Sequence, residues 1–465
     1  MRRVISAAVW VGIPIILLLF PPPAGLSVTA WHLFAIYIAA IIGLVLRPLP
    51  EAGVLLAIIA ASGLLFRNTS TLLLGYANGT VWLVFTAFMI GAAIIESGLG
   101  RRVAYLLIGR VGSSSLGLGY VFAVTDLILA PVTPSNTARS GGIVFPILRS
   151  VARSLGSPPG PQGRRIGAYL TVLLYSISLT TGYTFLTAIA PNLLTAKFGI
   201  DILKVDVTWS SWLIAAAAPA LASLFLLPLI VYLLYPPELK RIDNRRIAAE
   251  GLAELGPVTR RERILMVLFV LAILGWATGS LTGLDATTVA ISFVAATLVT
   301  GVVKWDVLLN QKSGWSTFMW YGGIVGLADA LTKAKFFSWL AQVLSAHIGT
   351  SGSPIVMMGA LVLLSVVIRY IFASQAAFVT AMVPVLFTVG TVAHLPAAPF
   401  FFLTAFATCY GGMTTHYGGA LGPVLFGDGY VDQRTWWIIG GVNALSSFVV
   451  NMVVGLVWWS IIGLW

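Results

Sequence analysis

The chain has 465 residues, of which 58% are hydrophobic and only 9% are charged. The apolar residues come in repeated runs of roughly 15 to 25, about the length of helix that spans a bilayer, and the alternating strands of an outer-membrane barrel are absent from the sequence. Because lipid accepts only helices or closed barrels, the sequence predicts an all-α polytopic membrane protein. The net charge of +12 does not indicate a nucleic-acid partner, because basic residues beside membrane helices usually report orientation.

Cysteine and histidine are too few and too scattered for a metal site. The single cysteine, Cys409, excludes a disulfide within the chain and a multi-cysteine metal cluster, and the four histidines do not gather around it. No Walker A loop, zinc-protease motif or nucleophile–base pair stands out. The residues therefore favour a transporter over an ATP-driven pump or an enzyme, and they call for no cofactor.

The first half of the chain, predicted as residues 1–235, alternates apolar spans with short connections. Its N-terminal run is interpreted as the first helix rather than as a cleaved signal, because no small-x-small site follows it. One apolar region is interrupted by LAPVTPSNTARSGGIVFPIL (129–148), which holds prolines, a Ser-Asn-Thr triplet, an arginine and a Gly-Gly pair. The candidate spans of this half are 5–20, 31–46, 52–66, 81–97, 103–151, 166–198 and 210–235.

A charged segment, residues 236–263, separates this half from a second hydrophobic half, residues 264–465. The segment is rich in both charge signs, which predicts a linker with a surface helix. The positive-inside rule puts the basic N-terminus and this linker on the cytoplasmic side of the inner (plasma) membrane. We therefore expect a multi-pass inner-membrane protein in contact with the lipid bilayer.

The two halves correspond to each other around two polar interruptions. TPSNTARSGGIVFPIL (133–148) matches FASQAAFVTAMVPVLF (372–387), so that Ser-Asn-Thr at 135–137 lies over Ser-Gln-Ala at 374–376. Each half then has a second interrupted span that is rich in Gly, Pro and Thr. Matched breaks of this kind indicate a transporter built from two inverted repeats. We therefore predict re-entrant hairpins around 116–151 and 354–395, and broken helices around 178–198 and 404–430.

A broken helix frees backbone groups that cannot face lipid, so each break predicts a polar cavity. Ser135, Asn136 and Thr137 are good helix-capping residues, and the amides at a helix start favour an anion. The same turn offers carbonyl and hydroxyl oxygens, which suit sodium. Arg139 follows two residues later and could hold a carboxylate through two parallel hydrogen bonds.

Structural alternatives stand beside these roles. Ser, Asn and Thr also hold membrane helices together by hydrogen bonds. Arg139 could pair with Asp126 instead of a ligand, and His416 could be satisfied by a neighbouring group. Asp126 and Arg369, both within apolar spans, are interpreted as members of structural ion pairs. The matched breaks nevertheless favour a binding tip over a simple helix interface at the first triplet.

Through the motifs PSNTAR, FASQ and THYG, the whole chain resembles the divalent anion/sodium symporter family, the dicarboxylate carriers of the citrate-transporter type. The resemblance implies about eleven spans plus two re-entrant hairpins, a homodimer, and a transport domain that moves as an elevator. It also implies that the hairpin tips bind the carboxylates of a C4 to C6 di- or tricarboxylate, and that sodium, where used, binds at each tip. Carried over to this sequence, the substrate-binding residues are Ser135, Asn136, Thr137, Arg139, Thr181, Ser374, Gln375, Ala376, Thr414, Thr415, His416, Tyr417 and Gly418. A sodium site, if the chain has one, falls at Ser135, Asn136 and Gly182.

The sequence departs from the symporter pattern in its second triplet, 374–376, which lacks both Asn and Thr. It is similar instead to the exchanger branch of the family, whose members swap one carboxylate for another. Arg139 and His416 can both be cationic, and fixed positive charge in place of sodium would make the empty site costly to move across the membrane. We therefore expect exchange of a carboxylate substrate for a counter-substrate, with no sodium requirement. Sodium-coupled symport is the alternative, and an anion channel is a remote one.

Overall fold

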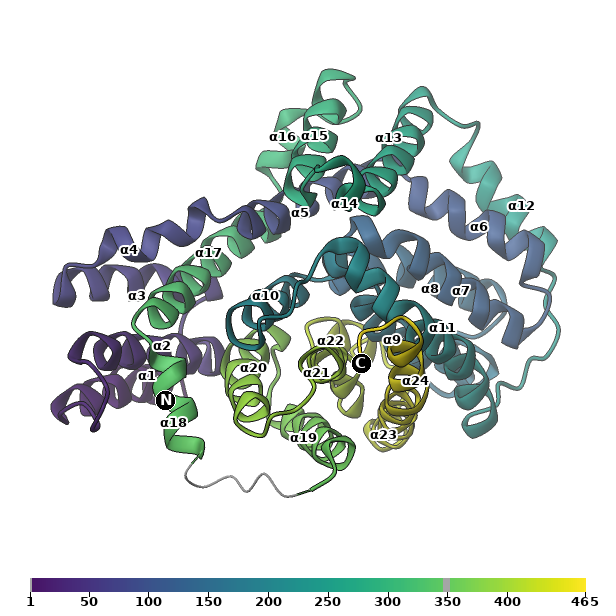
Figure 1. The fold of residues 1–465 in the computed structure, drawn as a ribbon. Coiled ribbons are helices and arrows are strands. Elements are labelled where there is room, and N and C mark those ends of the chain that lie inside the picture. The colour runs from purple at the N-terminus through teal and green to yellow at the C-terminus, as the bar shows by residue number, and fades with distance from the viewer. Residues whose placement is uncertain (1, 346–351) are drawn as a thin grey trace.

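In the computed structural model, which describes residues 2–345 and 352–465, the regular secondary structure of the described residues is helical (Figure 1). The helices up to the end of the charged segment are α1 (Arg2–Leu19), α2 (Val28–Leu46), α3 (Glu51–Phe66), α4 (Thr69–Leu73), α5 (Gly79–Ser97), α6 (Leu99–Val111), α7 (Ser115–Leu129), α8 (Phe145–Ser154), α9 (Gly167–Thr184), α10 (Ala190–Phe198), α11 (Trp209–Leu234) and α12 (Asn244–Leu255). The remaining helices are α13 (Arg260–Ala277), α14 (Gly279–Thr282), α15 (Ala286–Val299), α16 (Trp305–Leu309), α17 (Lys312–Lys333), α18 (Phe336–Ser345), α19 (Pro354–Ile368), α20 (Gln375–Val392), α21 (Ala397–Tyr410), α22 (Leu421–Phe426), α23 (Gln433–Val450) and α24 (Leu456–Ile461).

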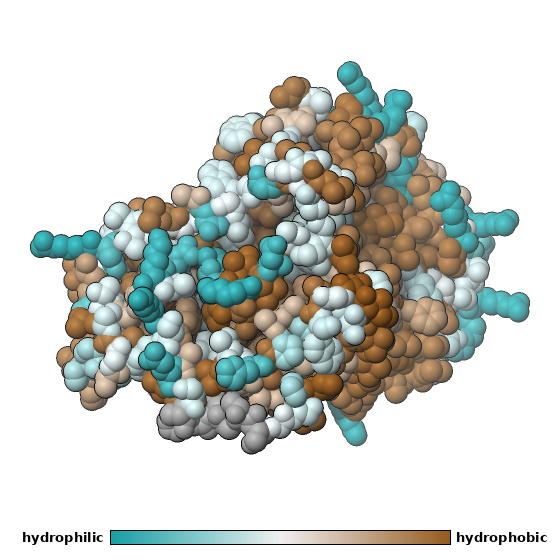
Figure 2. All heavy atoms as spheres, viewed as in Figure 1, coloured by the Kyte–Doolittle hydropathy of each residue, from teal (hydrophilic) through white to brown (hydrophobic). Residues whose placement is uncertain are grey.

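The surface and the helix lengths are those of a membrane protein. Within the described residues, 7 helices are long and apolar enough to cross a membrane, α2, α5 and α11 among them. Large apolar side chains stand on the surface, and Leu64, Leu281 and Val299 are 84%, 86% and 87% exposed. Figure 2 shows a broad hydrophobic area on the right of one face, with hydrophilic side chains protruding at its edges. Apolar surface of this extent suits contact with lipid, and the predicted all-α polytopic fold class is confirmed.

The helices pack as two groups (Figure 1). In the peripheral group (α1–α5 and α13–α17), α17 lies against α2, α3 and α5, and α15 packs beside α5. In the central group (α7–α11 and α19–α24), α9 lies against α7, α11 and α21, and α20 packs on α10 and α21. α18 joins the groups because it packs on both α17 and α20.

The central group contains the same order of elements twice. α7 ends in a 3-10 turn at Ala130–Val132, and extended residues then lead into a return helix at Thr137. α19 likewise ends in a 3-10 turn at Arg369–Ile371 and leads into α20. A broken helix follows each hairpin, α9 and α10 in one half and α21 and α22 in the other. The helix–turn–helix pairs and the helix breaks fall within the ranges given by the sequence patterns, while the re-entrant course of the hairpins and the domain boundaries at 235 and 264 stay predictions.

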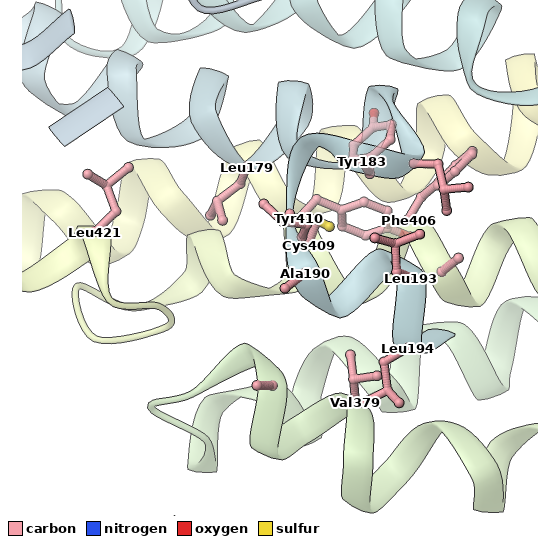
Figure 3. Close-up of a cluster of buried hydrophobic side chains, with 14 of the residues drawn as sticks. Leu179, Tyr183, Ala190, Leu193, Leu194, Val379, Phe406, Cys409, Tyr410 and Leu421 are labelled. Carbon is pink, nitrogen blue, oxygen red and sulfur yellow. The ribbon is translucent and has the colours of Figure 1, made fainter. Parts of the chain in front are cut away.

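The two broken helices are held together by the apolar core. Every residue of α9 is buried, because α7, α11 and α21 surround it. Tyr183 of α9 stacks on Phe406 of α21 with ring centroids 4.8 Å apart, and Trp212 of α11 meets Phe406 edge-on at 5.7 Å. Figure 3 shows Leu193 of the first broken helix near Tyr183 and Phe406. The core thus fixes the separation of the two breaks.

A buried ion pair joins the end of the charged segment, at the start of α13, to α6. Arg102 of α6 bonds Glu262 of α13 through Nε to Oε1 at 2.7 Å and through Nη2 to Oε2 at 3.2 Å. The side chains are only 9% and 3% exposed. Burial by itself would raise the pKa of the Glu262 carboxyl, but the hydrogen bonds from Arg102 and Thr259 outweigh burial and lower that pKa below its ordinary value.

Replacing Glu262 tests the value of this pair. Glu262→Gln should reduce the free energy of unfolding by about 3 to 5 kcal/mol, because Arg102 would stay buried without its partner. Thermal unfolding of the purified protein in detergent measures the loss. Glu250→Gln is the control: its partner, Arg246, and Glu250 itself are 54% and 58% exposed, so this change should have little effect.

The pair also gives stability a defined pH dependence. Because the folded-state pKa of Glu262 is lowered, its contribution is fully present above the unfolded value of about 4.3 and is lost as the pH falls through the lower, folded value. The difference in melting temperature between wild type and Glu262→Gln should therefore shrink as the pH drops below about 4. A difference that grows on acidification would contradict this assignment.

Candidate functional site

A cavity of about 190 Å³ lies between the two hairpin tips and the peripheral group. The first tip (135–137) and the second tip (374–376) line it together. The peripheral group contributes the opposite wall, made of Arg47, Glu51, Phe88, Thr317 and Trp320. The remaining lining residues are Pro134, Tyr175, Leu179, Ile189, Ala190, Pro191, Gly419, Ala420 and Leu421. A larger cavity, of about 390 Å³, lies between α11 and α14 and contains neither tip, so the smaller one is the candidate site.

Ser135 organises the first tip by capping the return helix. Its Oγ accepts a hydrogen bond from the Ala138 amide at 3.2 Å, and its carbonyl accepts one from the Arg139 amide at 2.9 Å. The return helix starts as a π-helical segment, Thr137–Val144, and such segments frequently mark functional sites. The first amides of a helix have no partner within it, so the tip presents N–H groups beside the cavity.

Ser374 caps α20 in the same way, because its Oγ accepts from the Ala377 amide at 3.3 Å. The next residue ties the second tip to both broken helices. Gln375 Nε2 donates to Cys409 Sγ of α21 at 3.1 Å, and that thiol donates to Asn192 Oδ1 of α10 at 3.7 Å. The two tips are therefore capped by equivalent serines, and the predicted residues 135–137 and 374–376 meet in one cavity.

Arg139 does not line the cavity. Its side chain is fully buried, and Nε lies 3.0 Å from Asp126 Oδ2. The other N–H groups of the guanidinium donate, at 2.9 to 3.1 Å, to Thr133 O, Ala188 O, Asn136 Oδ1 and Thr181 Oγ1. Every donor of the arginine therefore has a partner. The expectation that Arg139 is free to hold a carboxylate is corrected, and the alternative, an internal pair with Asp126, is confirmed.

Asp126 explains why the guanidinium of Arg139 is held inside the protein and not in the cavity. It also accepts hydrogen bonds from the hydroxyls of Ser140 and Thr181, and a buried carboxylate without a cation would be very costly. Thr181 is fully buried in this network and, like Arg139, does not line the cavity. Both residues act on the site indirectly, because Arg139 holds the Oδ1 atom of Asn136 in place at the tip.

Arg369 is the second arginine of the central group that is almost fully buried. Nη1 donates to Phe372 O at 2.6 Å, Nε donates to Thr408 O at 3.4 Å, and Nη2 donates to the Gly418 carbonyl. Among the described residues no carboxylate forms an ion pair with it. The interpretation of Arg369 as part of an ion pair was therefore wrong: the carbonyls freed by the breaks satisfy it, and its charge is not compensated. Gly418 directly precedes the cavity-lining Gly419.

The predicted contacts from the second broken helix lie beside the cavity rather than in it. His416 Nδ1 accepts a hydrogen bond from Trp437 Nε1 at 2.9 Å, and its ring stacks on Phe426. Because an indole N–H can only donate, this hydrogen bond favours the neutral form of His416 over the expected cationic one. The other predicted residues here that do not line the cavity are Thr414, Thr415, Tyr417 and Gly418.

The oxygens expected to bind sodium are already engaged by hydrogen-bond donors. Asn136 Oδ1 accepts from Arg139, and the Gly182 carbonyl accepts from Asn192 Nδ2 at 2.7 Å. A guanidinium within hydrogen-bonding distance would also repel a cation. The residues Ser135, Asn136 and Gly182 therefore do not fit sodium in this arrangement. Among the described residues, no group of three or more His, Cys, Asp or Glu side chains could hold a metal ion.

Sequence reasoning missed Tyr175 and the wall from the peripheral group. Tyr175 donates its hydroxyl to Gly412 O at 2.9 Å and lines the cavity. Arg47 and Glu51, in the stretch RPLPE, form an ion pair at 2.9 Å on the opposite wall. The only signal in the sequence was an arginine and a glutamate around two prolines after an apolar span, which says nothing about the cavity that they face.

Comparison with known proteins gives the family of the chain. A family model described as the sodium:sulfate symporter transmembrane region matches residues 2–465. The chain belongs to this family. Among the proteins similar to this symporter-family chain are inner membrane protein YbhI of Escherichia coli (47% identical, over 98% of this chain and 97% of the relative), dicarboxylate transporter 1 of Spinacia oleracea chloroplasts (35%, over 97% and 80%) and the L-tartrate/succinate antiporter of Shigella sonnei (32%, over 96% and 96%). The crystal structure of the Alcanivorax borkumensis YdaH transporter is similar in fold, with a TM-score of 0.56 at 14% identity over 99% of this chain and 98% of that one.

Replacing Arg139 distinguishes its internal role from a ligand role. Arg139→Met should lower the melting temperature of this symporter-family protein strongly, because Asp126 would be left buried and unpaired, at a cost of about 3 to 5 kcal/mol. The double variant Asp126→Leu with Arg139→Met should regain part of that loss. Arg110→Met is the control and should change little, because Arg110 is exposed and forms no ion pair in the described residues. An unchanged melting temperature for Arg139→Met would contradict the internal role.

Proposed function

We propose that this membrane transporter exchanges one di- or tricarboxylate for another across the inner membrane, without a sodium requirement. The substrates are C4 to C6 carboxylates such as succinate, malate, 2-oxoglutarate, citrate or tartrate. The names of similar proteins support this class, since one is a dicarboxylate transporter and another an L-tartrate/succinate antiporter. The name of YbhI, an inner membrane protein, supports the location. The homodimer and the cytoplasmic N-terminus remain part of the proposal.

One observation carries the proposal, namely the uncompensated charge of Arg369 behind the cavity. Its guanidinium bonds only carbonyl oxygens in the described residues, so it contributes one positive charge to the site. Each helix start adds roughly half a positive charge, and two helix starts, at the two tips, meet at the cavity. The total is roughly two positive charges, which a dicarboxylate would balance without a cation.

The two tips suit the two ends of such a substrate. Each tip presents free helix-start amides and a capping serine to the same cavity, and such amides bind carboxylates readily. We assign one carboxylate to Ser135, Asn136 and Thr137 and the other to Ser374, Gln375 and Ala376. Arg139 acts as a positioning residue through Asn136. Tyr175 lines the same cavity, and its hydroxyl donates to Gly412 O.

Exchange follows from the cost of moving the empty site. In an elevator-type cycle the central group would move past the peripheral group and carry the cavity across the membrane. The contact between Lys197 of α10 and Asp329 of α17 joins the two groups and would break in that movement. An empty site would carry the bare charge of Arg369 into a low-dielectric barrier. A loaded site is neutralised, so only the loaded transporter would cross.

Sodium-coupled symport is the second candidate. The intact Ser-Asn-Thr triplet of the first tip favours it, as does the name of the matching family model, which includes sodium. Against it stands the engagement of the candidate sodium ligands: Asn136 Oδ1 is bonded to a guanidinium, and the Gly182 carbonyl is bonded to Asn192. Transport in the absence of sodium separates the two functions.

Radiolabelled succinate uptake into liposomes that contain the purified protein tests the proposal. We expect rapid uptake only when the liposomes contain an unlabelled dicarboxylate, with equal rates in sodium and in potassium buffers. Liposomes without internal carboxylate are the control and should take up little label. Uptake into such empty liposomes, driven by a sodium gradient, would contradict exchange and support symport.

Gly182→Ala tests the first tip without removing a polar group. An added Cβ at Gly182 would lie 3.3 Å from Asn136 Oδ1 and 3.4 Å from its Nδ2, so it would displace the amide of the tip. The KM for succinate exchange should rise several-fold. Gly441→Ala is the matched control, because a Cβ there meets no atom within 4 Å, and its KM should stay at the wild-type value.

A further inference from the structure

We propose that Arg47 is a specificity-determining residue which binds a substrate carboxylate from the peripheral wall of the cavity. The inference rests on the proposed function, because it deepens the role of the same cavity. Arg47 and Glu51 are the charged residues among those that line the cavity in the described chain. Arg47 is therefore the one cationic side chain in direct reach of a ligand there, since Arg139 does not line the cavity and Arg369 is almost fully buried behind it.

The side chain of Arg47 is available for a ligand. It is 50% exposed, and its only ion-pair partner in the described residues is Glu51, 2.9 Å away and itself 26% exposed. An exposed pair of this kind contributes little to stability, so breaking it would cost little free energy. Arginine recognises carboxylates through two parallel hydrogen bonds. Glu51 accepts only one bond, from Nη2 to Oε1, so a substrate carboxylate that took its place could bond the guanidinium more fully.

The backbone fixes where Arg47 points. It ends α2 in the left-handed conformation, at φ 49° and ψ 52°, and its amide donates to Gly43 O. Pro48 and Pro50 stiffen the short connection to α3, which begins at Glu51. Arg67 ends α3 in the same conformation, at φ 53° and ψ 34°, but it does not line the cavity. Arg47 and Arg67 therefore both end a helix in the left-handed conformation, but of the two only Arg47 lines the cavity.

Glu51 supplies a reversible partner for Arg47. When a dicarboxylate enters, one of its carboxylates can replace Glu51 on the guanidinium. The released Glu51 carboxylate remains stabilised, because it lies in the first turn of α3, where the helix dipole favours negative charge. In the empty site Glu51 repels anions that carry too little charge to displace it. The pair therefore favours dianions over monocarboxylates.

Arg47 belongs to the peripheral group, whereas both tips belong to the central group. If the groups move past each other during exchange, the tips face Arg47 in only one of the two end conformations. The contribution of Arg47 should therefore be confined to substrate binding on one face of the membrane. This asymmetry distinguishes a direct contact from a general effect of surface charge.

Exchange in right-side-out and inside-out membrane vesicles tests the inference, with succinate as the probe on the outer side of each vesicle. Arg47→Gln should raise the KM for succinate by roughly tenfold on one face and leave the KM on the other face unchanged. Glu51→Gln should lower the KM on that same face, because it frees the guanidinium. Arg47→Gly keeps the left-handed backbone without strain and should repeat the effect of Arg47→Gln if that variant folds poorly.

Arg67→Gln is the matched control and should keep the wild-type KM on both faces. The inference is overturned if Arg47→Gln and Arg47→Gly keep the wild-type KM, if they raise it equally on both faces, or if Arg67→Gln raises it to the same extent. Wild-type vesicles distinguish a failure of the Arg47 contact from a failure of carboxylate exchange itself. If wild type exchanges succinate while the Arg47 variants match it, only this inference fails; if wild type does not exchange, the proposed function fails first.

Discussion

The structure depends on one constraint: a backbone carbonyl or amide freed inside a membrane must find a partner within the protein. Two hairpins and two broken helices free such groups in the central group. Buried arginines take up the carbonyls, since Arg139 bonds Thr133 and Ala188, and Arg369 bonds Phe372 and Gly418. Each arginine thereby joins a hairpin tip to a neighbouring broken helix. The tips keep their shape because these cross-links replace the hydrogen bonds of a continuous helix.

The two arginines differ in electrostatics, and the difference gives the site its character. Arg139 is neutralised by Asp126 at 3.0 Å, whereas Arg369 has no ion-pair partner in the described residues. A buried ion pair has nearly no net charge, so it attracts an anionic ligand only weakly. An unpaired buried cation attracts an anion strongly, because the dielectric constant around it is low. The second half of the chain therefore supplies the fixed charge, and the first half supplies the intact polar triplet. A substrate with two carboxylates would use both.

The cavity lies at the boundary between two groups of helices, which connects binding with movement. One wall is made by the tips and the other by residues of the peripheral group, such as Thr317 and Trp320. A site in such a position changes its wall whenever the groups shift. If the central group moves as proposed, contacts from the tips would accompany the substrate, and the proposed contact from Arg47 would belong to one conformation only. Under this proposal, affinity on the two faces of the membrane would differ without any change at the tips.

The sequence by itself predicted the class of the protein and the places where its helices break, because apolar length, proline breaks and matched capping residues are local patterns. It also pointed to the six residues 135–137 and 374–376, which line one cavity. The charge assignments at Arg139, Arg369 and His416 required the tertiary structure. Whether an arginine faces a cavity, a carboxylate or a carbonyl depends on which helix packs against it. Asp126, for example, lies in α7, on the inbound helix of the first hairpin, and pairs with Arg139 on the return helix. The positions of Tyr175 and Arg47 in the cavity lining could not be predicted either, since nothing in the sequence distinguishes them from any other tyrosine in a helix or arginine at a helix end. Such neighbours are brought together by packing between elements distant in the chain, and spacing along the sequence does not record them.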